Sequence, residues 1–343
     1  MAGDGPPTLP PLAVTMGEPA GIGPEIVVAA WIGRRAWRLP PFYFLADPAH
    51  LAERVRLVGA DCPMEVVTPG QAASRFDRAL PVVPLEARVR GTAGAPDPAD
   101  AAAVVEAITR AVADVDKGIA AAVVTNPISK RALHAAGFPH PGHTEFLASL
   151  SLSANGGATR PVMMLVGPEL RTVPVTIHMA LKDVAAALSP SLIVDTGEVV
   201  AADLRRRFAI PRPRIAVAAL NPHAGEGGAF GDEDDRVIRP AVVALNERGI
   251  DAVGPLPADS MFHPAARARY DAALCMYHDQ ALIPAKTLAF SETVNVTLGL
   301  PIVRTSPDHG TALDIAGRGV ANPGSLVAAL RLAAELRRNE LAA

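Results

Sequence analysis

A chain of 343 residues is longer than the roughly 250–300 residues that one hydrophobic core usually serves, so we expect two domains. Half of the residues are hydrophobic and 20% are charged, which suits a globular protein with a large core. The net charge is −3 and basic residues form no tract, so nucleic acid is not expected to be the main partner.

The sequence also carries expectations about cellular location. No apolar stretch approaches the roughly 18 residues of a transmembrane helix, and the first residues lack the basic and apolar regions of a signal peptide. We expect residues 1–12 to be a disordered lead-in and the protein to be cytoplasmic. Cys62 and Cys275 match no metal-binding spacing. A disulfide between them is conceivable, but reduced thiols fit a cytoplasmic protein better.

Short runs rich in valine and isoleucine alternate with helical patterns along the chain. The runs predict buried strands at residues 12–16, 42–46, 121–125, 162–166, 173–177, 215–220 and 272–277. Between 98 and 118, Val104, Ile108 and Val112 belong to one helical stripe, and 190–208 and 323–338 show a similar pattern. This alternation predicts a mostly parallel sheet with helices on both faces. Because no long linker interrupts it, two α/β domains that share chain segments fit better than two consecutive domains.

A glycine-rich turn follows the first predicted strand, where residues 17–25 read GEPAGIGPE. Pro24 suits the first position of a helix, and Gly21 and Gly23 allow a tight turn before it. Such a turn can present amide groups to an anion. The dinucleotide fingerprint fails, however, because Ile26 stands where its last glycine is required. The pattern alone leaves a structural turn and a phosphate cradle equally open.

Three histidines directly follow predicted strands, in short polar or glycine-bearing segments. They are His178 in TIHM, His223 in NPHAGEGG and His278 in MYHDQ. Ligands of open α/β sheets bind beyond the carboxyl ends of the strands. One such histidine is more often an ordinary polar loop residue, but three in one context predict a catalytic divalent-metal site with an open coordination position. Asp279 and Asp259 could orient a ligand imidazole or move a proton, and a surface or capping role is equally open for Asp259.

Near the end of the chain, residues 309–323 read HGTALDIAGRGVANP. The pattern by itself predicts a short helix between glycines followed by an Asn-Pro turn. This segment and the GIGPE turn together resemble the β-decarboxylating dehydrogenases of the isopropylmalate and isocitrate type. In that superfamily the turn opens the first helix, and a loop similar to residues 309–323 holds the adenosine end of the nicotinamide cofactor.

A closer resemblance is to the related 4-hydroxythreonine-4-phosphate dehydrogenase family of pyridoxal phosphate biosynthesis. The matching segments extend from 17 to 323 and include GHTEF (142–146), LNPHAGEGG (220–228), GPLPAD (254–259), YHDQ (277–280), VNVTLGLP (294–301) and RTS (304–306). The resemblance implies an isopropylmalate-dehydrogenase-like fold with two α/β/α domains that share chain segments and an active-site cleft between them. We expect residues 13–140 and 300–343 to form the cofactor-side domain, and 141–299 the metal, substrate and dimerisation domain.

The resemblance also implies a set of site residues. His178, His223 and His278 would bind one divalent metal per subunit (zinc, magnesium or cobalt), and Asp279 is the candidate catalytic residue. Substrate would be bound by His143, Thr144, Lys286, Asn295 and Arg304. The cofactor, NAD or NADP, would contact His309, Gly310, Asp314 and Asn322. In this family the protein is a homodimer whose metal site lies at the interface, with histidines from both subunits.

The implied reaction is a metal-dependent and NAD(P)-dependent oxidation of 4-phosphooxy-L-threonine. The product, 2-amino-3-oxo-4-phosphooxybutanoate, would then lose CO2 to give 3-amino-2-oxopropyl phosphate. Relatives in the same family oxidise threonate or erythronate 4-phosphate, or a dihydrodiol, and these stay as alternatives. Two other classes are a zinc hydrolase, since three histidines and a water also describe such sites, and a solute-binding protein. The cofactor loop speaks against the first, and the absent export signal against the second.

Overall fold

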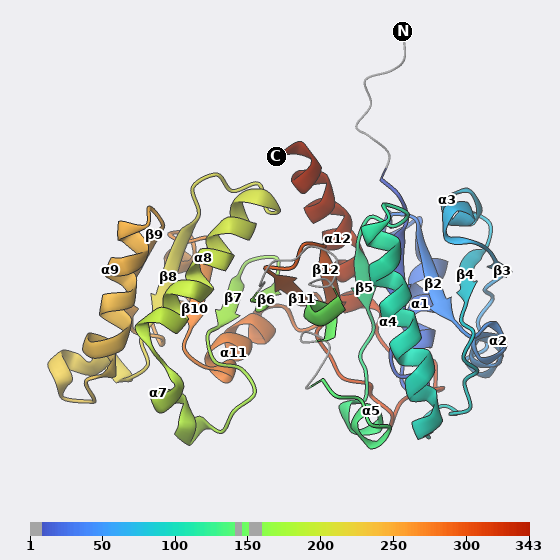
Figure 1. Ribbon diagram of the computed structural model, residues 1–343, viewed down its shortest axis with the longest axis horizontal. Coiled ribbons are helices and arrows are strands. Elements are labelled where there is room, and N and C mark those ends of the chain that lie inside the picture. Colours follow the sequence, from blue (N-terminus) through green and yellow to red (C-terminus); the bar gives the residue numbers. More distant parts are fainter. Residues whose placement is uncertain (1–8, 141–145, 151–159) are drawn as a thin grey trace, which may run out of the picture. The chain divides into compact units, whose positions relative to one another are not determined.

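The computed structural model describes residues 9–140, 146–150 and 160–343, and the chain forms two compact units (Figure 1). The first unit comprises Met1–Thr159 and Leu300–Arg338, and the second comprises Arg160–Gly299 and Asn339–Ala343. Each unit is an α/β structure, as the alternating sequence pattern predicted. No single helix among the described residues is long and apolar enough to cross a membrane, although the bent pair 181–187 and 190–206 passes by length and composition alone.

In the first unit, all strand pairs are parallel, in the order β3-β4-β2-β1-β5-β12. All five residues of β2 are buried, as expected of a strand covered on both faces. The strands are β1 (Leu12–Thr15), β2 (Phe42–Ala46), β3 (Met64–Val66), β4 (Leu80–Pro84), β5 (Val123–Thr125) and β12 (Arg304–Pro307). The helices are α1 (Gly23–Ile32), α2 (Pro48–Leu57), α3 (Ala72–Arg75), α4 (Ala101–Asp116), α5 (Lys130–Ala135) and α12 (Gly324–Ala342), the last of which is assigned to this unit only up to Arg338.

Helix α4 shows how an aliphatic sequence supplies this core. Val104, Ile108 and Val112 are buried, as their spacing predicted, and Ala103 and Ala107 lie beside them on the buried stripe. The helix packs against β1, β2 and β5. Pro98 begins a short 3-10 turn (Pro98–Asp100) that leads into the helix.

In the second unit, the strand order is β11-β6-β7-β10-β8-β9. The pairs of β6 with β11 and β7 are antiparallel, and β7, β10, β8 and β9 run parallel. The strands are β6 (Val162–Val166), β7 (Arg171–Pro174), β8 (Arg214–Ala218), β9 (Asp251–Leu256), β10 (Ala272–Cys275) and β11 (Val294–Leu298). The helices are α7 (Val184–Ala187), α8 (Pro190–Arg206), α9 (Arg239–Glu247), α10 (Pro264–Arg267) and α11 (His278–Ala289).

Some local details differ from the predictions. The segment 309–317 forms turns and no helix. His278 is the first residue of helix α11, and the sequence had placed it only after a strand. Strand β7 ends at Pro174, three residues before the predicted end, and this proline has no backbone N–H to donate to the ladder. Backbone pairing continues nevertheless, since Val175 N and Thr176 N donate to Cys275 O and Met276 O at 2.8 and 3.3 Å.

Candidate metal and substrate sites

The three histidines follow three neighbouring parallel strands of the second unit. His178 comes after β7, His278 after β10 and His223 after β8, and these strands lie in the order β7-β10-β8. Because β10 runs parallel to both of its neighbours, the carboxyl ends of all three strands share one edge of the sheet. The sequence placed each histidine after its strand, and the strand order places the three segments next to one another.

Two of these imidazoles lie close together. The ring centroids of His178 and His278 are 5.9 Å apart, with an angle of 43° between the rings. His278 Nδ1 lies 2.7 Å from Asp279 Oδ1, which leaves the Nε2 atom of the same ring for a ligand. Both histidines line a pocket of about 440 Å³. Its other lining residues are Ile177, Met179, Ala180, Leu181, Val184, Tyr277 and Asp279.

His223 stands apart in a segment of left-handed backbone. Its φ is 54°, and every residue from 223 to 228 has a positive φ. This conformation costs an L-residue with a Cβ roughly 1–2 kcal/mol. Among the residues that the structure describes, no group of three His, Cys, Asp or Glu side chains is arranged to hold a metal. One chain therefore brings together His178 and His278, and the position of His223 does not complete a three-ligand cluster with them.

The donor set nevertheless fits a divalent transition metal. Two imidazoles face each other beside a pocket, and a carboxylate hydrogen-bonds to the far nitrogen of one ring. Zinc and cobalt bind neutral imidazole, and the carboxylate partner is the usual means of orienting such a ligand.

A second pocket of about 450 Å³ adjoins the same segment on α11. Asp279 and Tyr277 line both pockets. The second pocket is otherwise largely apolar and is also lined by Ala258, Asp259, Phe262, Gln280, Ile283, Pro284, Thr287 and Leu288. Asp259, the other aspartate that the sequence singled out, therefore lies beside the α11 pocket together with Asp279.

The predicted substrate residues are divided between the units. Lys286 lies on α11 and Asn295 on β11, both half-buried in the second unit. The Lys286 Nζ atom is 5.7 Å from the centroid of the Phe290 ring. Arg304 begins β12 in the first unit. His143 and Thr144 lie outside the described residues.

Arg304 is buried, whereas a residue that binds substrate at the surface would be exposed. Its side chain is 3% exposed, and its Nε and Nη2 atoms donate to Thr125 Oγ1 at 3.2 and 2.6 Å. Burial lowers the pKa of the guanidinium to about 10, so Arg304 is still a cation at neutral pH. Thr125, at the carboxyl end of β5, was not identified from the sequence.

The glycine-rich turn is buried in the first unit, and backbone amide groups of the turn are hydrogen-bonded within the protein. Every residue from 11 to 28 is buried. Gly21 N donates to Glu18 O and Ile22 N to Thr311 O, both at 3.0 Å, and Ala20 N donates to Glu18 Oε1 at 3.2 Å. Since these amide groups already have acceptors in the protein, the structure favours a structural turn over a phosphate cradle.

The turn is joined to the 309–323 segment through Glu25, which also forms a buried ion pair with Arg54. Glu25 Oε2 accepts a hydrogen bond from Gly317 N at 2.7 Å and lies 3.6 Å from Arg54 Nη1. Arg54 in turn donates to Gly21 O and Pro19 O at 2.7 and 3.0 Å. Burial raises the pKa of the Glu25 carboxyl, against the Gly317 amide and the Arg54 charge, which lower it. The sequence carried a signal for this ion pair, because Glu25 is the one acidic residue in the otherwise apolar helix α1.

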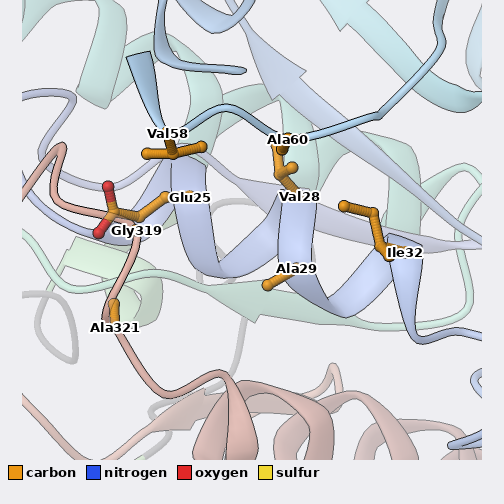
Figure 2. A pocket seen from close by; sticks show the side chains of 8 residues that line it. All are labelled: Glu25, Val28, Ala29, Ile32, Val58, Ala60, Gly319 and Ala321. Atoms are coloured by element: carbon orange, nitrogen blue, oxygen red, sulfur yellow. The ribbon is translucent and has the colours of Figure 1, made fainter. Parts of the chain in front are cut away.

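Glu25 also lines a small pocket of about 120 Å³ (Figure 2). Figure 2 shows the Glu25 carboxylate pointing from α1 toward Gly319. Glu25 Oε1 is buried and has no hydrogen-bond partner. The lining residues are Glu25, Val28, Ala29, Ile32, Val58, Ala60, Gly319 and Ala321. Gly319 and Ala321 belong to the predicted cofactor segment, although neither was among the cofactor residues expected from the sequence.

The four residues expected to contact the cofactor have different surroundings. Gly310, Asp314 and Asn322 are exposed, and His309 is half-buried with its Nδ1 atom 2.9 Å from Gly310 O. The His309 Nε2 atom is buried without a partner. Asn322 Oδ1 accepts a hydrogen bond from Gly324 N at 2.8 Å, at the start of α12. Asn322 therefore has a capping role whether or not it also binds a cofactor.

The two cysteines are buried free thiols in different units. Burial raises the pKa of Cys62 to about 12 and raises that of Cys275 further. Neither thiol therefore has the exposure or the low pKa of a nucleophile.

Comparison with known proteins identifies a family with this fold. Residues 38–333 match the family model described as "Pyridoxal phosphate biosynthetic protein PdxA". The chain is 55% identical over 334 residues to a 4-hydroxythreonine-4-phosphate dehydrogenase of Bradyrhizobium diazoefficiens, covering 95% of this chain and 96% of that relative. The crystal structure of 4-hydroxythreonine-4-phosphate dehydrogenase from Klebsiella pneumoniae is similar with a TM-score of 0.83 and 35% identity, covering 96% of this chain and 98% of the other.

A more distant similarity is to a terephthalate 1,2-cis-dihydrodiol dehydrogenase from Burkholderia xenovorans. The TM-score is 0.60 at 28% identity, over 94% of this chain and 96% of the other. These structures confirm the α/β fold class that the sequence resemblance implied.

Proposed function

Because the chain belongs to the PdxA family of pyridoxal phosphate biosynthetic proteins, and is thus an oxidoreductase, we propose that it oxidises 4-phosphooxy-L-threonine with NAD or NADP. The secondary alcohol loses a hydride to the nicotinamide and a proton, which gives 2-amino-3-oxo-4-phosphooxybutanoate. This β-keto acid then loses CO2 and becomes 3-amino-2-oxopropyl phosphate.

The observation that carries this proposal is the placement of three histidines at the ends of three neighbouring parallel strands. His178, His223 and His278 would hold one divalent metal, and the His178–His278 ring distance of 5.9 Å suits two ligands of one ion. When bound, such a metal lowers the pKa of the substrate hydroxyl and polarises the ketone that forms. Asp279 would act on His278 by accepting a hydrogen bond from Nδ1–H, which keeps the proton on Nδ1 and leaves Nε2 available for the metal.

We assign substrate binding to His143, Thr144, Lys286, Asn295 and Arg304, and recognition of the phosphate to the last three. Lys286 and Arg304 supply positive charge, and Asn295 supplies an amide donor. The Thr125 hydroxyl fixes the Arg304 guanidinium through two contacts, so its direction is set before substrate binds. A cation held in this way loses less conformational entropy when it meets a phosphate.

We assign the cofactor to the segment of His309, Gly310, Asp314 and Asn322. The segment is anchored at Gly317 by the Glu25 carboxylate and at Thr311 by the amide of Ile22. The pocket beside Gly319 and Ala321 adds an apolar surface next to this segment.

We further propose that the active protein is a homodimer in which His223 meets the His178–His278 pair of the other subunit. In the described part of one chain the three histidines form no metal-binding group, which supports a shared site. Large apolar side chains are exposed in the same segments as the histidines, and a partner subunit would cover them. They are Met179, Leu181, Phe230, Ile283 and Phe290.

The proposal is tested by following the near-ultraviolet absorbance of reduced nicotinamide with a panel of substrates. The panel contains 4-phosphooxy-L-threonine, threonate and erythronate 4-phosphate, and terephthalate dihydrodiol, each with NAD and with NADP. The dihydrodiol is included because of the similarity to the Burkholderia xenovorans enzyme. We expect the highest kcat/KM with 4-phosphooxy-L-threonine. A higher value with the dihydrodiol would transfer the assignment to that reaction, and hydrolysis without nicotinamide reduction would overturn both.

A further inference from the structure

The left-handed segment 223–228 needs an external support. Three of its residues, His223, Ala224 and Glu226, carry a Cβ and have φ of 54°, 55° and 41°. Each of them is disfavoured in this conformation, so the segment persists only where surrounding contacts determine it. The relevant contacts are those at Leu220 and Asn221, shortly before the segment, and at the helical turn that follows it.

These contacts converge on one buried carboxylate. Asp234 is fully buried and begins the π-helical turn Asp234–Ile238. Its Oδ1 accepts a hydrogen bond from Leu220 N at 2.9 Å, and its Oδ2 accepts one from Asn221 N at 3.1 Å. A Cβ added to Gly225, inside the left-handed segment, would lie 3.5 Å from Asp234 Oδ2, so the carboxylate also lies against the segment itself.

We propose that Asp234 is a positioning residue for His223. Its two hydrogen bonds hold the chain just before the left-handed segment, and so set the direction in which the His223 imidazole leaves the end of β8. Without these two hydrogen bonds, residues 223–228 relax toward ordinary backbone conformations. Metal binding must then restore the left-handed conformation, which lowers the affinity for the metal. The inference rests on the metal-binding role proposed above for His223.

Only a carboxylate satisfies both amide donors. An asparagine at position 234 offers one acceptor oxygen, and its NH2 group would face the second N–H donor. The substitution D234N therefore keeps the volume of the side chain but breaks one of its two hydrogen bonds to the backbone. Asp235 is the matched control, since its exposed carboxylate is ion-paired with Arg239 at 2.8 Å on the same helical segment and touches neither amide.

The experiment compares the Zn²⁺ dissociation constants of the parent, D234N and D235N, measured on metal-free protein by competition with a chromophoric chelator. We expect D234N to bind Zn²⁺ about tenfold more weakly, as with other residues that orient a metal ligand, and D235N to stay within about twofold of the parent. Equal affinities for D234N and D235N would overturn the inference. His223→Ala separates the proposed metal site from the role of Asp234. Parent-like Zn²⁺ affinity in H223A refutes the metal site. Weaker Zn²⁺ binding in H223A without weaker binding in D234N refutes only the role of Asp234.

Two more variants separate positioning from folding. Ala224→Gly places a residue that tolerates positive φ inside the segment, so in the D234N background it should recover part of the lost Zn²⁺ affinity. No recovery would show that backbone strain is not what Asp234 offsets. If D234N does not fold, Asp234→Glu keeps both acceptor oxygens but displaces them by one methylene from Leu220 N and Asn221 N. Weaker Zn²⁺ binding in folded D234E than in D235N supports the inference, and parent-like binding overturns it.

Discussion

The imidazole rings of His178 and His278 lie 5.9 Å apart within one chain, although one follows β7 and the other begins α11. Their proximity results from the parallel pairing of β7 with β10, which brings the ends of the two strands to the same edge of the sheet. The two residues can therefore act as a chelating pair without a large rearrangement of the second unit. This geometry determines how the proposed metal site should be tested.

The first prediction concerns the metal. His178→Ala, His223→Ala and His278→Ala should each abolish turnover and leave the thermal unfolding transition of the metal-free protein nearly unchanged, because these strand-end residues are not part of the core. Chelator treatment of the parent should also abolish turnover, and Zn²⁺, Mg²⁺ or Co²⁺ should restore it. His263→Ala is the control, since His263 is exposed and precedes α10. Full activity in any of the three variants would remove that histidine from the site.

The second prediction concerns the sharing of the site between subunits. If His178 and His278 of one chain meet His223 of the other, coexpressed H178A and H223A should form mixed dimers with one intact site and partial activity. Mixed dimers of coexpressed H178A and H278A should contain no intact site and show no activity, because each chain lacks one histidine of its own His178–His278 pair. Rescue in the second combination would place His178 and His278 of different chains at one metal. A fully active monomer in sedimentation would contradict a shared site.

The third prediction concerns the substrate phosphate. Lys286→Ala and Arg304→Ala should each weaken binding of phosphorylated substrate by about 1.5–3 kcal/mol if the contact is charge-assisted and desolvated. Arg304→Ala should also lower the unfolding temperature, because it removes a buried side chain bonded to Thr125. Lys182→Ala, at an exposed position, is the control. Equal losses on phosphorylated and unphosphorylated substrates would show that the two residues have another role.

The fourth prediction concerns the cofactor segment. Gly317 has a φ of +78°, and a Cβ at this position would come within 2.7 Å of both Ala93 Cβ and Leu57 Cδ2. Gly317→Ala should therefore displace the segment and raise the KM for NAD or NADP. The affinity for metal, which we assign to histidines of the second unit, should stay unchanged. Gly70→Ala is the matched control, since nothing lies within 4 Å of a Cβ there. A normal cofactor KM in Gly317→Ala would argue against this segment as the binding site.

The fifth prediction concerns the pH dependence of stability. Burial raises the pKa of Glu25 above its ordinary value of 4.5, so the folded protein binds the proton more tightly than the unfolded chain does. The resulting stabilisation is fully present below 4.5 and is lost as the pH rises through the pKa of the folded state. Glu25→Gln cannot ionise, so the free energy of unfolding of the parent relative to this variant should decrease from acidic to neutral pH. Urea titrations across that range would measure it, and a constant difference would contradict the raised pKa.

Much of the secondary structure could be predicted because it depends on local patterns. The predicted strand 42–46 coincides with β2, and the stripe of Val104, Ile108 and Val112 faces the core as expected. The segment 309–317 was predicted wrongly as a helix. Its local pattern resembles a short helix, but Gly317 N is held by Glu25, a residue from the other end of the sequence, and the backbone forms turns.

The candidate site was predictable in its residue types and less so in its geometry. Each histidine could be assigned to the end of a strand, because an apolar run followed by a polar residue is visible locally. The roles of Thr125 and Asp234 were not predictable, since each depends on a partner that is distant in sequence or in another element. A buried aspartate among three neighbouring acidic residues has no local signal that separates it from Asp235, which is exposed.

The sequence by itself determined which chemical groups stand at the ends of the strands, and its motifs determined the family. Only the tertiary structure decided that β10 lies between β7 and β8, and hence that the histidine segments are neighbours. It also decided that the glycine-rich turn is structural and that Arg304 is buried against Thr125. The physical reason is that periodicity and residue type act over a few neighbouring residues, whereas strand order and burial depend on pairing between segments far apart in the chain.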